Sequence, residues 1–146
     1  MANGLLKLEL KLYNDAAEIP RAHDALDQFA AAHGLAGPEL ARLHVALEEH
    51  LTNVISYGYD PGQPGVISLR FTFQPSWLGI EIEDDARTFN SSEAKEVDIT
   101  LSLDAKPVGG LGLLLLRKCV DELNYHRENE HNVLVLKKRV SVPRSE

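Results

Sequence analysis

Glu49 and Asn53 are the first residues whose types and spacing could do chemistry together. They lie within a stretch whose apolar residues recur at helical spacing: Leu40, Leu43, Leu47, Leu51 and Val54. At about 100° per residue, Glu49 and Asn53 fall one turn apart on a flank of this helix, away from the apolar stripe. A carboxylate can accept a proton, and an amide oxygen is a neutral hard ligand suited to Mg²⁺. Taken alone, the pair is better explained by a solvated helix face.

Asp84 is a second candidate, because it continues the alternation of a predicted strand. Leu78, Ile80 and Ile82 occupy every second position of that strand, and Asp84 follows in the same phase. A carboxylate on the apolar side needs a hydrogen-bond donor, since an unpaired buried charge is costly. By itself the pattern favours a strand that ends at Glu83, with Asp84 turned to solvent. The functional alternative is a ligand donor, such as an exocyclic amino group.

A glycine run, Gly109-Gly-Leu-Gly112, precedes the apolar stretch 113–121. Glycines let the backbone approach a ligand closely, and the free N–H groups at a helix start can bind an anion. A dinucleotide-binding fingerprint would need a third glycine at position 115, which is Leu115. A phosphate-binding P-loop would need Gly-Lys-Ser/Thr, which this run lacks. A plain tight helix entry explains the run equally well.

Composition limits the class of protein. The chain has 146 residues, 44% of them hydrophobic, which is enough for one domain with its own core, 1–146. A net charge of −7 argues against a broad nucleic-acid footprint. The single cysteine, Cys119, excludes an internal disulfide and suits a reducing compartment. No apolar run reaches the roughly 20 residues of a membrane helix, and the start lacks a signal peptide. We therefore expect a soluble, cytoplasmic protein.

The hydrophobic periodicity predicts an α/β fold of the α+β type. We expect a two-layer sandwich with three main helices, 19–33, 38–57 and 110–122, on one face of a mixed, mainly antiparallel sheet. The predicted strands are 6–12, 67–73, 78–84, 123–127 and 133–140, with a turn at 128–132 joining the last two. The polar stretch 91–106 is predicted to be a loop.

Taken together, the motifs resemble a known family. Glu-His-Leu-Thr-Asn at 49–53, Asp-Asp-x-x-x-Phe at 84–89 and Gly-Gly-Leu-Gly at 109–112 fall in the order and register of the gyrase, MutL and histidine kinase ATPase superfamily, the Bergerat fold. Within it, the tail at 117–125 is similar to the small anti-sigma-factor serine/threonine kinases. The resemblance covers nearly the whole chain.

The resemblance implies a role for each matching residue. Glu49 matches the general base, Asn53 the Mg²⁺ ligand, and Asp84 the carboxylate that accepts a hydrogen bond from the adenine amino group. The remaining implied nucleotide-binding positions are Ala86, Gly109, Gly110, Leu111, Gly112 and Leu113. The implied cofactors are ATP and Mg²⁺, and the implied partners are a small anti-sigma-factor antagonist and a sigma factor. Direct contact with nucleic acid or membrane is not expected, and a homodimer is left open.

Three positions depart from the family pattern. Ala86 stands in place of a glycine, Ser56 in place of a lysine, and Val135 in place of a threonine that reaches the adenine through water. Two function classes follow. The intact Glu49 and Asn53 favour a partner-switching protein kinase, whereas the three departures favour a non-catalytic binding module of the same fold.

The histidines and the cysteine suggest no further chemistry. His44 and Glu48 are one turn apart, but we find no second ligand pair with metal-site spacing, so surface or core histidines are expected. Cys119 lies in an apolar helix and is expected to be inert.

Overall fold

A computed structural model describes residues 7–87 and 110–140, and of residues 110–114 the backbone alone. Its elements in chain order are β1 (Lys7–Tyr13), the short 3-10 helix η1 (Ala16–Glu18), α1 (Ile19–Ala32), α2 (Pro38–Tyr57), β2 (Val66–Gln74), β3 (Trp77–Asp84), α3 (Gly110–Cys119), β4 (Glu122–Glu128) and β5 (His131–Arg139). Within this part of the chain, no helix is long and apolar enough to cross a membrane.

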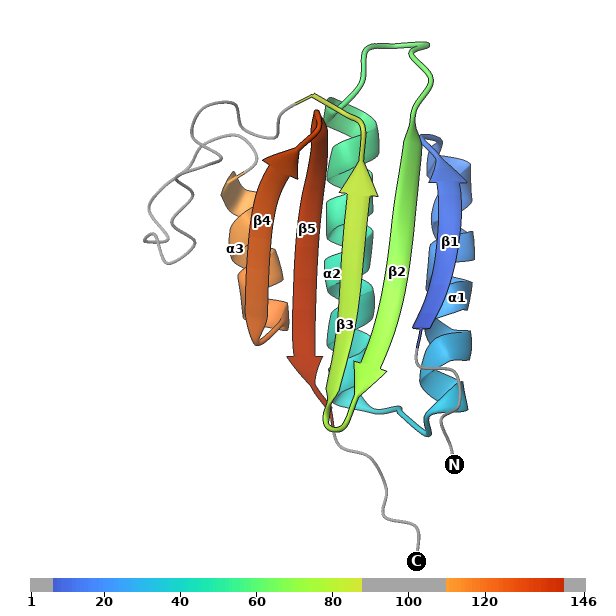
Figure 1. The fold of residues 1–146 in the computed structure, drawn as a ribbon, viewed down its shortest axis with the longest axis vertical. Coiled ribbons are helices and arrows are strands. Elements are labelled where there is room, and N and C mark those ends of the chain that lie inside the picture. Colours follow the sequence, from blue (N-terminus) through green and yellow to red (C-terminus); the bar gives the residue numbers. More distant parts are fainter. Residues whose placement is uncertain (1–6, 88–109, 141–146) are drawn as a thin grey trace, which may run out of the picture.

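The strands form one sheet in the order β1-β2-β3-β5-β4. The helices α1, α2 and α3 cover one face of this sheet and leave the other face open (Figure 1). The predicted two-layer sandwich is thereby confirmed. Its sheet is simpler than the mixed one expected, because all four strand pairings in the described residues are antiparallel.

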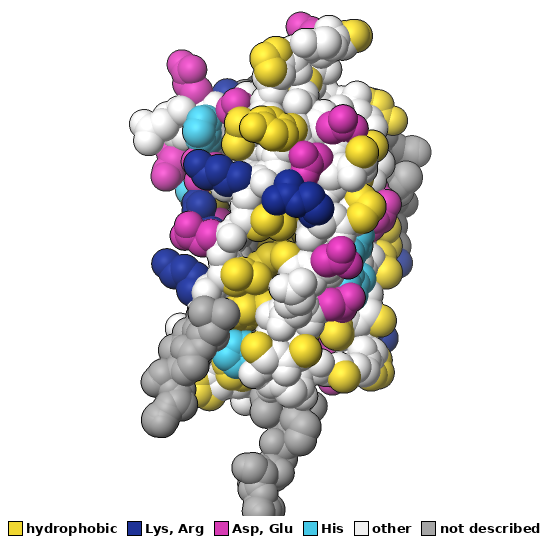
Figure 2. Space-filling view, turned by 90° about the vertical axis from the view of Figure 1, so that its right-hand side faces the viewer, with side chains coloured by type: hydrophobic (Ala, Val, Ile, Leu, Met, Phe, Trp, Pro, Cys, Tyr) yellow, Lys and Arg dark blue, Asp and Glu magenta, His cyan; other side chains and the backbone are white. Residues whose placement is uncertain are grey.

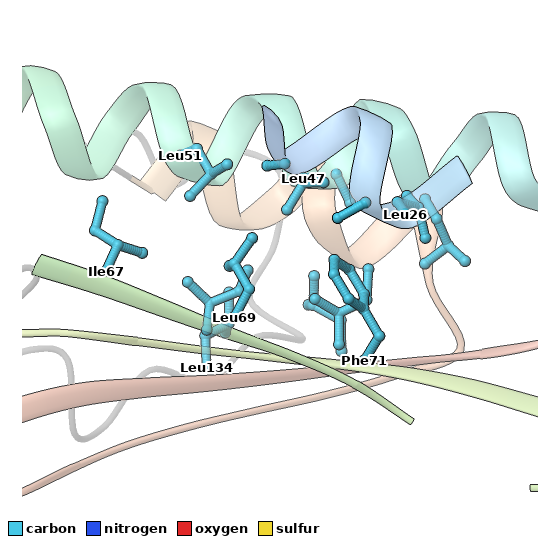
Figure 3. Packing of buried hydrophobic residues seen from close by; sticks show 14 of the residues in the cluster. Leu26, Leu47, Leu51, Ile67, Leu69, Phe71 and Leu134 are labelled. Carbon is cyan, nitrogen blue, oxygen red and sulfur yellow. The ribbon is translucent and has the colours of Figure 1, made fainter. Parts of the chain in front are cut away.

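The core lies between the two layers and follows from the two periodicities. Leu26 of α1 and Leu47 and Leu51 of α2 point towards the sheet (Figure 3). Every second side chain of the strands points towards the helices. Among these side chains are Ile67, Leu69, Phe71 and Leu134, which are also fully or almost fully buried. At roughly 1.5–3 kcal/mol per buried side chain of this size, this layer supplies most of the stabilising free energy.

Two predicted boundaries were wrong, and the second matters for the site. The helix predicted to run to residue 122 ends at Cys119, because the Asp121 N–H donates to the Lys137 carbonyl oxygen and begins the β4–β5 ladder. The turn predicted at 128–132 contains only Asn129 and Glu130, both at positive φ (52° and 65°). Two residues at positive φ suit the tight hairpin turn that matches strand twist.

Several element ends meet at one end of the domain. Figure 1 shows the end of α2, the end of β3, the start of β5 and the start of α3 at this end. The Arg87 N–H donates to the Gly58 carbonyl oxygen (3.1 Å), and Arg87 Nη2 donates to Asp60 Oδ1 (2.6 Å). These bonds tie the segment after β3 to the end of α2. The predicted loop 91–106 lies outside the described residues.

Candidate functional site

The α2 pair has the geometry predicted from its spacing. Asn53 Nδ2 donates to Glu49 Oε2 over 3.0 Å, and both side chains are half-buried. This bond uses the NH₂ group of the amide, so the Asn53 carbonyl oxygen takes no part in it. The arrangement therefore presents a carboxylate and a neutral oxygen side by side, which is a donor set that Mg²⁺ accepts when water and phosphate oxygens complete the shell.

Asp84 lies on the helix-covered face of the sheet, as its phase predicts. Its exposed fraction is 1%, which rules out the alternative in which it turns to solvent. Two donors satisfy it: the Asn132 side-chain amide (2.8 Å) and the Ala86 N–H (2.9 Å). Burial raises the pKa of the Asp84 carboxyl, and these two hydrogen bonds oppose that rise. Both bonds end on Oδ1, and no described residue donates to Oδ2.

Asn132 is a residue of the candidate site that the sequence does not predict. It lies directly opposite Asp84 in the β3–β5 register and is 4% exposed. Its Nδ2 also donates to the carbonyl oxygen of Arg87 (3.0 Å), so one amide holds both the carboxylate and the segment that follows it. The sequence predicts Asn132 as part of a turn, because nothing in it indicates that the hairpin turn has two residues.

The side-chain carbonyl oxygen of Asn132 accepts hydrogen bonds from two residues of β4. It accepts from the Tyr125 hydroxyl (2.6 Å) and from Arg127 Nη1 (2.9 Å). A charged donor and a phenol thus fix the amide in one orientation, with its NH₂ towards Asp84. The result is a connected polar network that runs from the buried Asp84 and Asn132 to the exposed Arg127. Such networks are stable only when each member is satisfied.

The methyl group of Ala86 fits because the residue it faces at the end of α2, Gly58, has no side chain. This methyl group is buried against the end of α2, where a Cβ built on Gly58 would lie 2.6 Å from the Ala86 Cβ. The methyl group that replaces the family's glycine is therefore directed at Gly58. Its backbone N–H remains bonded to Asp84, as described above.

The other two departures occupy different places. Val135 pairs with Glu81, and so it lies on the open face of the sheet, on the opposite side from Asp84. The expectation that position 135 reaches an adenine beside Asp84 was therefore wrong. Ser56 is exposed on α2 and lines a groove between α1 and α2 together with Pro20 and Thr52.

The glycine run enters α3. Gly110 is the first residue of this helix, and Leu111, Gly112 and Leu113 belong to its first turn. Gly109 lies outside the described residues. Helix α3 packs beside α2, so its start lies in the same layer as Glu49 and Asn53. Among the described residues, no group of three or more histidine, cysteine or acidic side chains could hold a metal ion on its own.

Comparison with known proteins agrees with this fold. The sequence profile of the histidine kinase-like ATPase domain matches residues 12–138. The serine/threonine-protein kinase BtrW of Bordetella bronchiseptica is 30% identical over 94 residues, which cover 64% of this chain and 66% of BtrW. The serine-protein kinase RsbW of Bacillus subtilis is 24% identical over 142 residues, which cover 94% of this chain and 88% of RsbW. The chain thus spans slightly under two thirds of BtrW and most of RsbW.

A solved structure is similar in fold. The histidine kinase domain from the Erythrobacter litoralis EL346 blue-light activated histidine kinase superposes with a TM-score of 0.55 at 19% identity, covering 85% of this chain and 60% of that one. At this identity the likeness concerns the fold. With the profile match over 127 of 146 residues (12–138), it leads to one conclusion: the chain belongs to the histidine kinase-like ATPase domain family.

Proposed function

We propose that this chain is an ATP-dependent serine/threonine protein kinase of the anti-sigma-factor type. In this proposal it phosphorylates a small antagonist protein and sequesters a sigma factor by partner switching. The observation that carries it is the buried Asp84, held by two hydrogen bonds on Oδ1 while Oδ2 accepts none from the described residues. The names of the relatives, serine-protein kinases RsbW and BtrW, support the reaction class.

At the base end of the site, Asp84 Oδ2 is the acceptor for the adenine amino group. Asn132 and the Ala86 N–H both donate to the other oxygen, Oδ1, and no described residue donates to Oδ2. A hydrogen bond to a charged, buried acceptor contributes about 1.5–3 kcal/mol. Because a carboxylate only accepts, this position favours a base that donates an amino group.

At the phosphate end, Glu49 and Asn53 divide the work. The Asn53 carbonyl oxygen is the protein ligand for the metal, and Glu49 accepts the proton of the attacking hydroxyl. Mg²⁺, when bound, neutralises charge on the phosphate oxygens. The first turn of α3, which begins at Gly110, would offer backbone N–H groups to the phosphates, with Gly109, Leu111, Gly112 and Leu113 in the same run. Phosphoryl transfer needs mainly positioning and charge neutralisation, which these groups supply.

A non-catalytic, nucleotide-responsive binding module remains the second candidate. Ser56 favours it, because a serine brings no positive charge at the position where the family pattern has a lysine. The other two departures from the family pattern, Ala86 and Val135, do not favour the binding module. The Ala86 methyl packs against Gly58, and Val135 lies on the open face.

Two substitutions on α2 test the proposal. Glu49→Ala removes the base and leaves the metal ligand, so Mg-ATP should still bind while phosphate transfer falls by about 10²–10⁴-fold. Asn53→Ala removes the metal ligand, so Mg-dependent binding itself should weaken. The assay is calorimetric titration of Mg-ATP, paired with labelled-phosphate transfer to candidate antagonist domains.

Glu39→Ala is the matched control, because it removes a carboxylate at the other end of the same helix. Equal loss of ATP binding in the Glu49 and Asn53 variants would contradict the division of roles. A parent protein that binds Mg-ATP but transfers no phosphate would establish the binding module instead.

A further inference from the structure

A chain of four polar side chains joins α1 to α2 outside the site described above. His23 and Asp27 are one turn apart on α1, and His44 and Glu48 are one turn apart on α2. The pairs cross: His23 Nε2 lies 2.8 Å from Glu48 Oε1, and His44 Nε2 lies 2.7 Å from Asp27 Oδ1. The two rings meet at their Nδ1 atoms, 2.7 Å apart. In Figure 2, histidine and acidic side chains gather on the side of these helices.

The outer contacts fix the tautomer of each ring. An ionised carboxylate only accepts hydrogen bonds, so the Nε2 atoms of His23 and His44 must both carry protons. A neutral ring protonated at Nε2 has a bare lone pair at Nδ1. Without another proton, two lone pairs would face each other at 2.7 Å. With two further protons, two N–H groups would collide. Only with one proton between the two Nδ1 atoms is this contact a hydrogen bond.

The ring geometry fits a proton better than a metal ion. The ring planes differ by only 24°, and the centroids lie 4.9 Å apart while the Nδ1 atoms lie 2.7 Å apart. The separation of the centroids exceeds the separation of the Nδ1 atoms by about two ring radii. The two Nδ1 atoms therefore lie nearly on the line between the centroids, and the rings lie end to end with their lone pairs in line. Two histidines on one Zn²⁺ instead hold their nitrogens about 2.0–2.1 Å from the ion at a tetrahedral angle, which needs a wider and bent arrangement.

We propose that His23 and His44 form a binding site for one shared proton, held between their Nδ1 atoms and flanked by Asp27 and Glu48. Among the described residues, these two carboxylates are the charged groups in contact with the rings. Each ring is 24% exposed, and His23 and Glu48 also line an open groove of about 340 Å³, so water can deliver the proton. The site ties α1 to the helix that carries Glu49, the residue after Glu48.

The sign of the pH dependence follows from proton counting. In the unfolded chain each histidine titrates on its own near pH 6.5. Below that pH the unfolded chain takes up a second proton that the folded pair resists, so the stabilisation falls. Above it the folded pair keeps a proton that the unfolded chain has released, so the stabilisation falls again as the pH rises. The contribution of the pair should therefore peak near pH 6.5.

Nitrogen NMR of the full-length protein labelled in its histidines tests the site without any substitution. We expect the two Nδ1 signals to move together and to stay between their protonated and bare positions over a broad range around neutral pH. Two Nδ1 signals that change independently of each other with pH would overturn the proposal. A saturable shift of both Nδ1 signals with one equivalent of Zn²⁺ at neutral pH would also overturn it, and would indicate a metal site.

Chemical unfolding at pH 5, 6.5 and 9 gives the second readout. His44→Gln should raise the unfolding equilibrium constant about tenfold at pH 6.5 and only a few-fold at pH 5 and 9. His126→Gln is the matched control, because His126 contacts one carboxylate, Glu128 (3.3 Å), from an exposed strand. A loss of stability that is equal at all three pH values would show ordinary packing and would contradict the shared proton.

Discussion

Glu83 and Asp84 are neighbouring carboxylates on β3 that experience opposite surroundings. Glu83 lies on the open face, where His131 Nδ1 (2.6 Å) and Arg70 Nη2 (2.7 Å) contact it. The hydrogen bond from His131 is the main reason that the pKa of Glu83 is lowered. Asp84 lies on the covered face, where burial raises the pKa of its carboxyl. One step along a strand, rather than residue type, decides between the two.

The difference also appears in how each carboxylate is satisfied. Glu83 is half-buried, with 28% of its side chain exposed, so losing one ion-pair partner leaves it accessible to solvent. Asp84 is almost fully buried, and among the described residues its donors are the Asn132 amide and the Ala86 N–H. A substitution on the covered face should therefore have large effects, and the corresponding one on the open face small effects.

The largest expected effect comes from Asn132→Leu. It removes a donor to Asp84 and the acceptor for Tyr125 and Arg127, so the free energy of unfolding should fall by about 4 kcal/mol. Urea unfolding measures this. Asn124→Leu on the open face of β4 is the control and should change stability by less than about 0.5 kcal/mol. Equal losses in the two variants would remove the contrast between the faces.

Acidification should act next most strongly, through His50 of α2. Burial lowers the pKa of His50 to about 4, below its ordinary 6.5. The unfolded chain therefore binds the proton more tightly, and stability is lost as pH falls from about 6.5 towards 4, by roughly 3 kcal/mol. His50→Leu should remove this part of the pH dependence, whereas His131→Gln on the open face should retain it. Unfolding curves at pH 7 and 4.5 would test both, and an unchanged slope in His50→Leu would refute the assignment.

Asp84→Asn should weaken ATP binding tenfold or more, since it exchanges a charged acceptor for an amide that can also present a donor to the adenine amino group. Glu83→Gln, one residue away, should leave the affinity unchanged. Calorimetric titration of Mg-ATP into both variants separates them. If the two bind alike, Asp84 does not read the base.

The smallest effect should come from the open face itself. The lowered pKa of Glu83 means that its stabilisation is present above about pH 4.5 and is lost as the pH falls through the folded value. Glu83→Gln should therefore reduce stability by less than about 1 kcal/mol at pH 7, and the difference should shrink towards pH 3. Asp84 should show the opposite sign, because its raised pKa makes protonation favour the folded state. If the stability losses of Glu83→Gln and Asp84→Asn changed with pH in the same direction, this assignment would be contradicted.

Local periodicity was enough to predict the fold and half of the candidate site. The helical period set Glu49 beside Asn53, and the strand phase set Asp84 among Ile80 and Ile82. Both depend on residues within one element, where backbone geometry dictates the neighbours. The pattern by itself favours Asp84 turned to solvent, since burial of this carboxylate depends on donors from elsewhere in the chain.

Contacts between elements could not be predicted in the same way. Asn132 meets Asp84 only because the β4–β5 turn has two residues, and turn length was not evident from the sequence. The His23–His44 contact has the same origin. Each histidine has a carboxylate one turn away on its own helix, but only the packing of α1 on α2 brings the pairs together.

The turn at Asn129 and Glu130 makes the length of this hairpin a chemical constraint. Side chains alternate along β5, so one inserted or deleted turn residue that slipped the strand by one position would exchange its two faces. A deletion would bring Val133, and an insertion His131, opposite Asp84 in place of Asn132, and in both cases the hydrogen-bonded amide would move to the open face. In most surface loops a one-residue insertion is tolerated. Here it would act like a simultaneous substitution at every position of the strand, and among homologues this hairpin should vary in sequence far more readily than in length.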